Sequence, residues 1–417
     1  MGRPRLTDRD EWGCNRPRSL RVPSSVITDE PDQPGPHPSR APVFLVGLVA
    51  LAVVIAVGAF LLTSGDTGPT RQGSRPATEP SPLVDPDDII SGGPPPDGIP
   101  PIDDPRFQAL AEADWLSDRQ PVIAVEIDGD ARAYPLLILT WHEIVNDQVG
   151  GTPAAITYCP LCNSPVVWER PIVDGEITTF GTSGKLYHSN LVMYDRATES
   201  YWPQLTGQAV TGPLTGRRLE LVPAQIVSFG DFRAAHPDGK VLSRNTGFSR
   251  PYGTNPYPGY DETENPFLFM GEVDPRLPPA ERVIGITGGD EAVAFAYRRL
   301  RTASGGAMAA VNEEVGGEPV LVVWKPGTVS ALDQETIETS RDVGAAAGFS
   351  RQVGDQVLTF QVRSGQLVDG ETETTWNVLG KAVEGPLAGQ ELPGVAAMDS
   401  FWFDWAAFHP DTEIWSG

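Results

Sequence analysis

The chain has 417 residues, of which 40% are hydrophobic, so it is long enough for more than one folded unit with its own core. Its formal net charge of −24 at pH 7 argues against nucleic acid as a partner, because no basic stripe exists to release phosphate counterions. An acidic surface of this kind instead keeps an exported domain soluble or suits a saline environment.

The N-terminal part of the chain contains a candidate membrane anchor. Residues 1–42 are rich in Pro, Arg and Ser and predict a disordered cytoplasmic tail. The run Val43–Leu62 has no charge and no proline, and its length matches the roughly 20 residues of a transmembrane helix. A signal peptide would have a shorter polar start and a clean small-residue cleavage site. We therefore expect an uncleaved, single-pass anchor.

The basic residues around this helix predict its orientation. Most of them precede the helix: Arg3, Arg5, Arg9, Arg16, Arg18, Arg21 and Arg40. Only Arg71 and Arg75 follow it closely. The positive-inside rule therefore predicts a cell-membrane protein with a cytoplasmic N-terminus and an extracytoplasmic main domain. Cys14 would then be separated from Cys159 and Cys162 by the membrane.

Composition divides the rest of the chain into four parts. Residues 63–88 are polar and contain Pro, which is typical of a flexible spacer. Residues 89–245 begin with a Pro- and Gly-rich lead-in and form a first repeat. Residues 246–279 are a connector rich in aromatic residues and Pro. Residues 280–417 form a second, degenerate repeat.

The exported part predicts an α+β fold that is rich in β-structure. Pro121–Ile127 and Ala131–Leu136 read as two strands around an Asp-Gly-Asp turn, which is typical of a hairpin. Leu137–Asp147 has apolar residues at helical spacing and predicts a helix. Ser228–His236 predicts a short helix with a serine cap. Further strands are expected at the segments AAITY, PVVWER, EITTF and LVMYD.

Internal repeats predict a tandem duplication of a mostly antiparallel β unit. The segment Trp202–Leu219 recurs as Trp376–Leu392, and each copy is followed by a helix that ends in His-Pro-Asp. Upstream, Val145–Pro153 matches Val311–Pro319.

Reactive side chains occur in only one of the two copies. Trp141-His142-Glu143 corresponds to Ala307-Met308-Ala309, and Cys159-Pro160-Leu161-Cys162 corresponds to Lys325-Pro326-Gly327-Thr328. If the two copies share a fold, these residues of the first copy are not needed to form it. Their restriction to one copy therefore favours a chemical role.

The cysteine pair Cys159 and Cys162 allows three interpretations. The first is a redox couple of the thioredoxin type, but that fold places the pair at the start of a helix, and Pro165 with β-branched neighbours predicts a strand instead. The second is a metal-binding turn, in which Asn163 adopts the left-handed conformation. The third is a plain disulfide, which would close a very short loop and contribute at most about 2 kcal/mol.

A metal site at this turn would need further ligands. The nearest candidates are His142, on the predicted helix, and His188, on the hairpin GKLYHSNL, while Glu143 could bind through oxygen or act as a base. Two thiolates and one or two imidazoles suit copper or zinc. Metal binding by Cys159, Cys162, His142 and His188 is the preferred interpretation, and redox cycling is the alternative.

The remaining candidates have simpler interpretations. His236 and His409 occupy equivalent places before Pro-Asp, which favours helix C-terminal capping. The tyrosines of the connector could cover a ligand or merely pack a long loop, and a non-catalytic module that binds a glycan or peptide is therefore a third possible function.

The chain resembles a bacterial and archaeal family called Domain of Unknown Function 3179. The resemblance runs from about Asp88 onward through SGGPPPDGIPPIDDPRF, AYPLLILTWHEIVND, VGGTPAAITYCPLCNSPVVWER, FGTSGKLYHSNLVMYDRATESYWPQ and RPYGTNPYPGYD. It implies an exported or membrane-tethered protein without a settled activity, and it assigns no catalytic residues. Cys159, Cys162 and Glu143 are therefore catalytic candidates from the residues alone, and the reaction, the substrate and any small-molecule or protein partner stay open.

Overall fold

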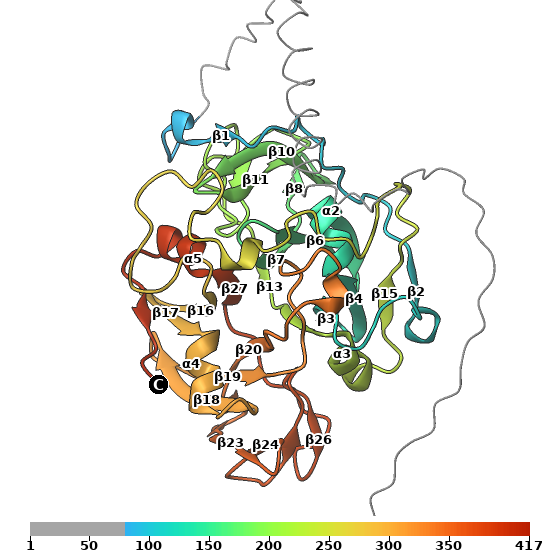
Figure 1. Ribbon diagram of the computed structural model, residues 1–417, viewed down its shortest axis with the longest axis vertical. Helices are drawn as coiled ribbons and strands as arrows, with labels where there is room; N and C mark the ends of the chain where they lie inside the picture. Colours follow the sequence, from blue (N-terminus) through green and yellow to red (C-terminus); the bar gives the residue numbers. More distant parts are fainter. Residues whose placement is uncertain (1–79) are drawn as a thin grey trace, which may run out of the picture. The chain divides into compact units, whose positions relative to one another are not determined.

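The computed structural model describes residues 80–417 (Figure 1). The predicted cytoplasmic tail, the predicted transmembrane helix and most of the predicted spacer lie outside the described residues. Within residues 80–417, no helix combines the length and the apolar character that crossing a membrane requires. The described part of the spacer includes a hydrogen bond from the Leu83 amide to the Val210 carbonyl, at 2.9 Å.

The described residues form a β-rich fold of several mostly antiparallel sheets with four short α-helices. Each helix has seven residues: α2 (Leu136–His142), α3 (Phe229–Ala235), α4 (Tyr297–Ala303) and α5 (Trp402–Phe408). The described residues also contain four single-turn 3-10 helices. η1 (Pro86–Asp88) precedes the first strand, and the other three lie between strands: η2 (Leu110–Glu112), η3 (Tyr260–Glu262) and η4 (Ile337–Thr339).

The first segment, up to residue 245, contains three sheets of four or five strands. The strand orders are β14-β3-β4-β15-β2, β13-β7-β6-β5 and β1-β10-β11-β12, with a small β8-β9 hairpin. The strands are β1 (Ile90–Ser91), β2 (Phe107–Ala109), β3 (Pro121–Ile127), β4 (Asp130–Pro135), β5 (Ile144–Val149), β6 (Thr152–Cys159), β7 (Ser164–Glu169), β8 (Ile172–Val173), β9 (Glu176–Ile177), β10 (Phe180–Tyr187), β11 (Asn190–Asp195), β12 (Tyr201–Pro203), β13 (Leu221–Val222), β14 (Gln225–Ser228) and β15 (Lys240–Leu242).

The second segment, from residue 280, contains sheets with the orders β27-β16-β17-β28, β18-β19-β20 and β23-β24-β25-β26, with a β21-β22 hairpin. Its strands are β16 (Arg282–Gly288), β17 (Glu291–Ala296), β18 (Ala309–Val315), β19 (Glu318–Lys325), β20 (Ala345–Ser350), β21 (Gln352–Val353), β22 (Gln356–Val357), β23 (Phe360–Arg363), β24 (Gln366–Asp369), β25 (Thr375–Trp376), β26 (Ala382–Glu384), β27 (Ala397–Phe401) and β28 (Glu413–Ile414).

Several predicted elements are confirmed. β3 has the predicted bounds, and the turn after it places Asp128 and Gly129 at φ 49° and 78°, as a tight hairpin turn requires. α3 begins after Ser228, whose hydroxyl accepts a hydrogen bond from the Asp231 amide at 3.0 Å. His236 is the C-cap of this helix, as predicted.

The helix predicted over Leu137–Asp147 is wrong in its second half. α2 ends at His142, and Glu143 has φ 59°, a conformation that no helix continues. The following residues form β5, in which Ile144 and Val145 pair with β6. β-Branched residues that can pair with a neighbouring buried strand gain more there than in another helical turn.

The two segments share their order of elements. In each, a hairpin, a seven-residue helix and a second hairpin follow one another, and a later helix precedes a short strand that pairs in parallel, β15 with β4 and β28 with β17. A buried indole also donates to an Asp in each: Trp202 to Asp195 at 3.0 Å and Trp376 to Asp369 at 2.9 Å.

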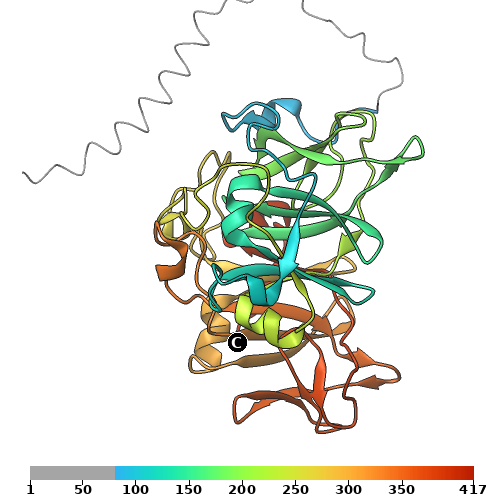
Figure 2. The same cartoon turned by 90° about the vertical axis from the view of Figure 1, so that its right-hand side faces the viewer.

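The segments pack on each other through a shared core. One hydrophobic cluster contains Val122, Ile156 and Trp202 of the first segment together with Phe401 and Trp405 of the second. β27 packs on β7, and in the corresponding position β14 packs on β20. Figure 2 shows the result from the side: part of the red C-terminal segment lies among the green strands of the first segment.

Candidate functional site

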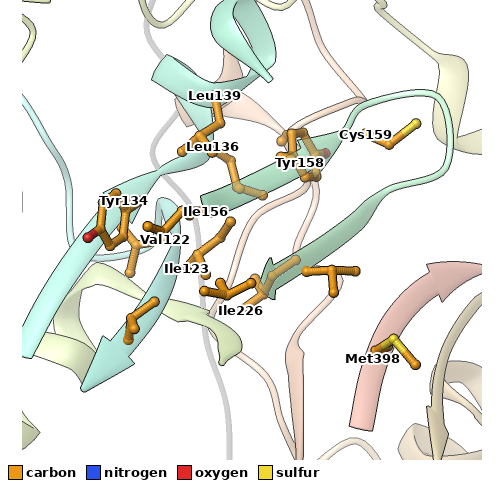
Figure 3. Packing of buried hydrophobic residues seen from close by; sticks show 14 of the residues in the cluster. Val122, Ile123, Tyr134, Leu136, Leu139, Ile156, Tyr158, Cys159, Ile226 and Met398 are labelled. Carbon is orange, nitrogen blue, oxygen red and sulfur yellow. The ribbon is translucent and has the colours of Figure 1, made fainter. Parts of the chain in front are cut away.

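The two cysteines lie at the turn between β6 and β7. Cys159 is the last residue of β6 and pairs in register with Ser164, the first residue of β7. Asn163 has φ 51°, so the predicted left-handed residue is confirmed. The segment after the pair is a strand, which also confirms that the turn does not have the helix of a thioredoxin. Figure 3 shows Cys159 at the end of its strand, beyond the cluster around Ile123 and Ile156.

Both cysteines are buried free thiols in contact with each other. Their sulfur atoms lie 3.1 Å apart, whereas a disulfide bond is about 2.05 Å long. Cys159 is 2% exposed and Cys162 is fully buried. The Cys162 thiol lies 3.4 Å from the Ser189 carbonyl oxygen, to which it can donate.

Asp404, which the sequence analysis missed, approaches Cys162 from helix α5 of the second segment. Its carboxyl group is fully buried. Burial raises its pKa to about 7, although hydrogen bonds from Ser400, Cys162 and Asn190 act to lower that pKa. The Ser400 hydroxyl donates to it at 2.7 Å. Burial, followed by hydrogen bonding with Cys159 and the nearby Asp404 carboxyl, raises the pKa of Cys162 well above its usual value.

Asn190 connects the thiol to the carboxyl group. Its side-chain amide lies 3.5 Å from the Cys162 sulfur and 3.1 Å from Asp404 Oδ1. The same amide lies 3.3 Å from Gln204 Oε1, and Gln204 in turn donates to Thr157 at 2.9 Å. All of these groups are buried, so the network fixes the positions of the thiol and the carboxyl group.

His142 does not face the thiols with a free nitrogen. Its Nδ1 lies 2.7 Å from the Pro100 carbonyl oxygen, to which it donates, so its Nε2 accepts from the Tyr252 hydroxyl at 2.6 Å. Burial lowers the pKa of His142, which keeps the ring neutral. The neighbouring Trp141 donates to the Thr254 carbonyl at 3.1 Å. Both side chains therefore anchor the connector to the first segment.

His188 and Ser189 form the two-residue turn between β10 and β11. Their φ values are 51° and 69°, a strained conformation for residues other than glycine. The His188 ring packs on Tyr187, Phe269 and Phe408, with centroid distances of 4.2, 6.0 and 5.8 Å. The turn thereby aims the Ser189 carbonyl at the sulfurs while the imidazole packs among aromatic rings.

Glu143 lines an apolar cavity of about 370 Å³ beside the site. The connector contributes Tyr257, Tyr260 and Phe267 to its wall, and Leu161, which lies between the two cysteines, also lines it. Glu143 is 7% exposed, and burial raises its pKa to about 8. The predicted carboxylate candidate therefore lies in a cavity next to the thiol turn and is protonated at neutral pH.

The second segment has an ion pair where the first has its thiols. By strand register, Lys325 at the end of β19 corresponds to Cys159 at the end of β6. Lys325 pairs with Asp231 of α3, at the helix position that Asp404 occupies in α5. Each helix thus presents an aspartate to the other segment. Asp404 of α5 faces the thiol pair of the first segment, and Asp231 of α3 faces Lys325 of the second.

The four predicted metal ligands do not all lie together. The structure brings Cys159 and Cys162 together, but in residues 80–417 no three His, Cys, Asp or Glu side chains are grouped closely enough to hold one ion. Copper or zinc binding by Cys159, Cys162, His142 and His188 stays a prediction. The signal that could have revealed Asp404 was an aspartate at the same position of the two matching helices, Asp231 and Asp404.

Comparison with known proteins gives a family and no function. A family model described as "Protein of unknown function (DUF3179)" matches residues 96–412, which is most of the chain. No curated protein and no solved structure matches it.

Proposed function

Because the chain belongs to the DUF3179 family, whose description names no activity, we propose a function from its site: thiol–disulfide exchange by Cys159 and Cys162, assisted by Asp404. The observation that carries the proposal is a pair of free thiols 3.1 Å apart, in a network with a buried carboxyl group whose pKa is about 7. A carboxyl group with that pKa can accept and return a proton at neutral pH.

The proposed roles follow from burial. Cys159 is the more exposed of the two residues. It would lose its proton to solvent and attack one sulfur of a disulfide substrate, forming a mixed disulfide and releasing the other substrate sulfur as a thiolate, which takes up a proton. Cys162 would then give its proton to the Asp404 carboxylate and attack the sulfur of Cys159. The second substrate sulfur leaves as a thiolate and is protonated. In total, two S–H bonds of the protein are exchanged for one S–S bond, and the substrate gains two electrons and two protons.

Access to the sulfurs depends on the connector. The Ser189 hydroxyl donates a hydrogen bond to the Phe267 carbonyl oxygen at 2.5 Å. The Phe267 amide in turn donates to the hydroxyl of Tyr260, another connector residue, at 3.1 Å. Phe267 itself is 49% exposed. We propose that this part of the connector moves aside when a disulfide substrate binds, because the thiols are otherwise covered.

The wider setting is part of the same proposal. A thiol pair that forms a disulfide suits the oxidising environment outside the cell, where the predicted anchor Val43–Leu62 would place the folded part of the chain. The shared element order supports an origin of the two segments by tandem duplication, after which only the first kept its thiols. In this view residues 89–245 hold the chemistry, and residues 280–417 supply Asp404.

Cysteine variants of the full chain, treated with oxidised glutathione, test the proposal. Cys162→Ser should trap a mixed disulfide between Cys159 and glutathione, detected by mass spectrometry of the intact protein. The wild type should pass through that adduct to an internal disulfide. Cys159→Ser is the matched control and should react far more slowly, because Cys162 is fully buried.

Two results would overturn the proposal. One is a wild-type thiol pair that stays reduced in the folded protein over the whole range of glutathione redox buffers. The other is equal reactivity of the two single variants. Metal analysis of the same preparations would reveal copper or zinc, so the predicted metal site is tested alongside.

A further inference from the structure

We infer that the cavity lined by Glu143 is a binding site for a neutral small molecule with a flat apolar body and a carbonyl group. The inference rests on the cavity and holds whether or not the thiols cycle. Its volume of about 370 Å³ lies within the range of small-molecule sites in proteins.

The wall of the cavity selects an apolar body. Aliphatic residues and aromatic rings make up most of it: Pro94, Ile99, Leu161, Leu186, Leu191 and Phe267. Tyr257 and Tyr260 add two further rings from the connector. Aromatic rings and branched aliphatic side chains together form a wall that would remove the apolar surface of a flat molecule from water.

Within the described residues, Glu143 supplies an unpartnered polar group in this mostly apolar wall. Glu143 is 7% exposed, and among residues 80–417 no side chain or backbone group forms a hydrogen bond with its carboxyl group. A buried polar group without a partner is costly, so a ligand that pairs with it gains that energy. The Tyr257 hydroxyl also has no hydrogen-bond partner in the described part of the chain, and it lines the same cavity.

The two groups favour a carbonyl oxygen over other polar groups. A protonated carboxyl group and a phenol each have one O–H to donate. A carbonyl oxygen has two lone pairs and can accept both. An anionic ligand is disfavoured, since it would be desolvated against an apolar wall. Among residues 80–417, the one cationic side chain at the wall is Lys185, whose ammonium lies over the Tyr201 ring, 5.8 Å from the centroid.

The backbone supports a role outside folding. Glu143 is held at φ 59°, which is strained for a residue with a side chain. By strand register the second segment has Ala309 at this position, in the extended conformation of β18. The fold of the second segment therefore forms without the strain and without the buried acid.

Photolabelling with benzophenone tests the site, because this neutral ketone forms a covalent bond to nearby C–H groups when it is irradiated. The full chain is labelled in lipid nanodiscs at pH 6.5, and cross-linked peptides are located by mass spectrometry. We expect labels on the peptides that contain Leu186, Leu191 and Tyr257. Leu186→Trp, which fills the cavity, should remove them.

Competition and pH then test the carbonyl contact. 2-Acetonaphthone should compete with the label about tenfold better than 2-ethylnaphthalene, which has the same ring system without the carbonyl group. Labelling should weaken about tenfold from pH 6.5 to pH 9.5, since ionised Glu143 accepts but no longer donates. Glu143→Gln keeps a donor and should label equally at both pH values, and Glu143→Leu should label weakly at both.

Other titratable groups do not share this pH response. The pKa values of Tyr257 and Tyr260 are raised by burial, so both phenols stay neutral at pH 9.5. The pKa of His142, which precedes Glu143, is lowered by burial, so the ring is mostly neutral at pH 6.5 and above. Three results would overturn the inference: labels outside the cavity, labels unaffected by Leu186→Trp, and equal competition by the ketone and the hydrocarbon. Labelling that persists in Cys159→Ser/Cys162→Ser would separate it from the thiol chemistry.

Discussion

Asp404 and Cys162 are two neighbouring acids whose pKa values are both raised by burial. The pKa of the carboxyl group is raised to about 7, and that of the thiol lies well above its usual value. Near neutral pH the carboxyl group is therefore partly ionised while the thiol keeps its proton. This order of pKa values suits a carboxylate that removes the proton only when the sulfur attacks.

Asp404→Asn should slow the closure of the Cys159–Cys162 disulfide and remove its rise with pH. In the wild type, the rate of closure from the glutathione adduct should rise as the pH passes about 7, because Asp404 loses its proton there. General-base catalysis typically contributes about 10²–10⁴-fold, so a loss of at least tenfold at pH 7.5 is expected. Quenched-flow measurements with thiol alkylation give the rates.

Ser400→Ala is the control for this prediction. The hydrogen bond from Ser400 lowers the pKa of Asp404, so its removal should shift the rise in rate to higher pH and leave the limiting rate in place. An Asp404→Asn profile that coincides with the wild type would show that the carboxyl group takes no part in the proton transfer.

The elements that the sequence predicted well are those set by local chemistry. The β3–β4 turn, the serine cap of α3 and the left-handed Asn163 each depend on neighbours within a few residues. The end of α2 was mispredicted because the apolar spacing of Leu137–Asp147 fits a helix, whereas β5 is selected by pairing with β6. Trp141 and His142 were read as reactive, but their partners Thr254 and Tyr252 lie in the connector, which no local pattern indicates.

The ion pair of Lys325 and Asp231 joins β19 of one segment to α3 of the other. The Lys325 side chain is 35% exposed and that of Asp231 20% exposed, so the pair is partly screened by solvent. A double-mutant cycle with Lys325→Met and Asp231→Asn should give a coupling free energy of about 0.5–1 kcal/mol in urea unfolding. The coupling should shrink in high salt.

The redox chemistry supplies the control for that cycle. Neither variant touches the thiol turn, so glutathione reactivity of Cys159 should stay at the wild-type value in both. Strictly additive losses of stability, without a coupling term, would mean that the pair contributes nothing to the contact between the segments.

The packing of the whole molecule explains why the site could be predicted only in part. Cys159 and Cys162 are neighbours in sequence, and the sequence identified them. Asp404 reaches Cys162 only because β27 lies on β7 and carries α5 with it. Figure 1 shows β27 beside β7 although the two strands are far apart along the chain. Contacts of this kind follow from how two segments pack, and single-sequence patterns do not contain that information.

Three buried carboxyl groups make the stability of the whole molecule depend on pH in an unusual direction. Glu143, Asp399 and Asp404 have pKa values of about 8, 7 and 7, all raised by burial. In the unfolded chain such groups titrate near pH 4. Between those values these three groups bind more protons in the folded state than in the unfolded state, so their contribution to the free energy of unfolding falls as the pH rises.

The folded part, residues 80–417, should therefore be more stable at pH 5 than at pH 8. A single group of this kind changes the free energy of unfolding by up to about 1.4 kcal/mol per pH unit in its window, so a loss of at least about 2 kcal/mol is expected over that range. Urea unfolding followed by tryptophan fluorescence at both pH values measures it.

Glu143→Gln with Asp404→Asn should reduce the difference, because two of the three groups no longer titrate. Asp130 and Asp274, whose pKa values are lowered by Arg132 and Arg276, act in the opposite sense where the pH falls below about 4. His142, His236 and His409, whose pKa values are lowered by burial, also act in the opposite sense below the usual histidine pKa of about 6.5, so they offset part of the loss expected between pH 5 and pH 8. A stability that is flat or rises from pH 5 to pH 8 would mean that these carboxyl groups are solvated in the folded protein, and the acid roles assigned to Glu143 and Asp404 would then fail together.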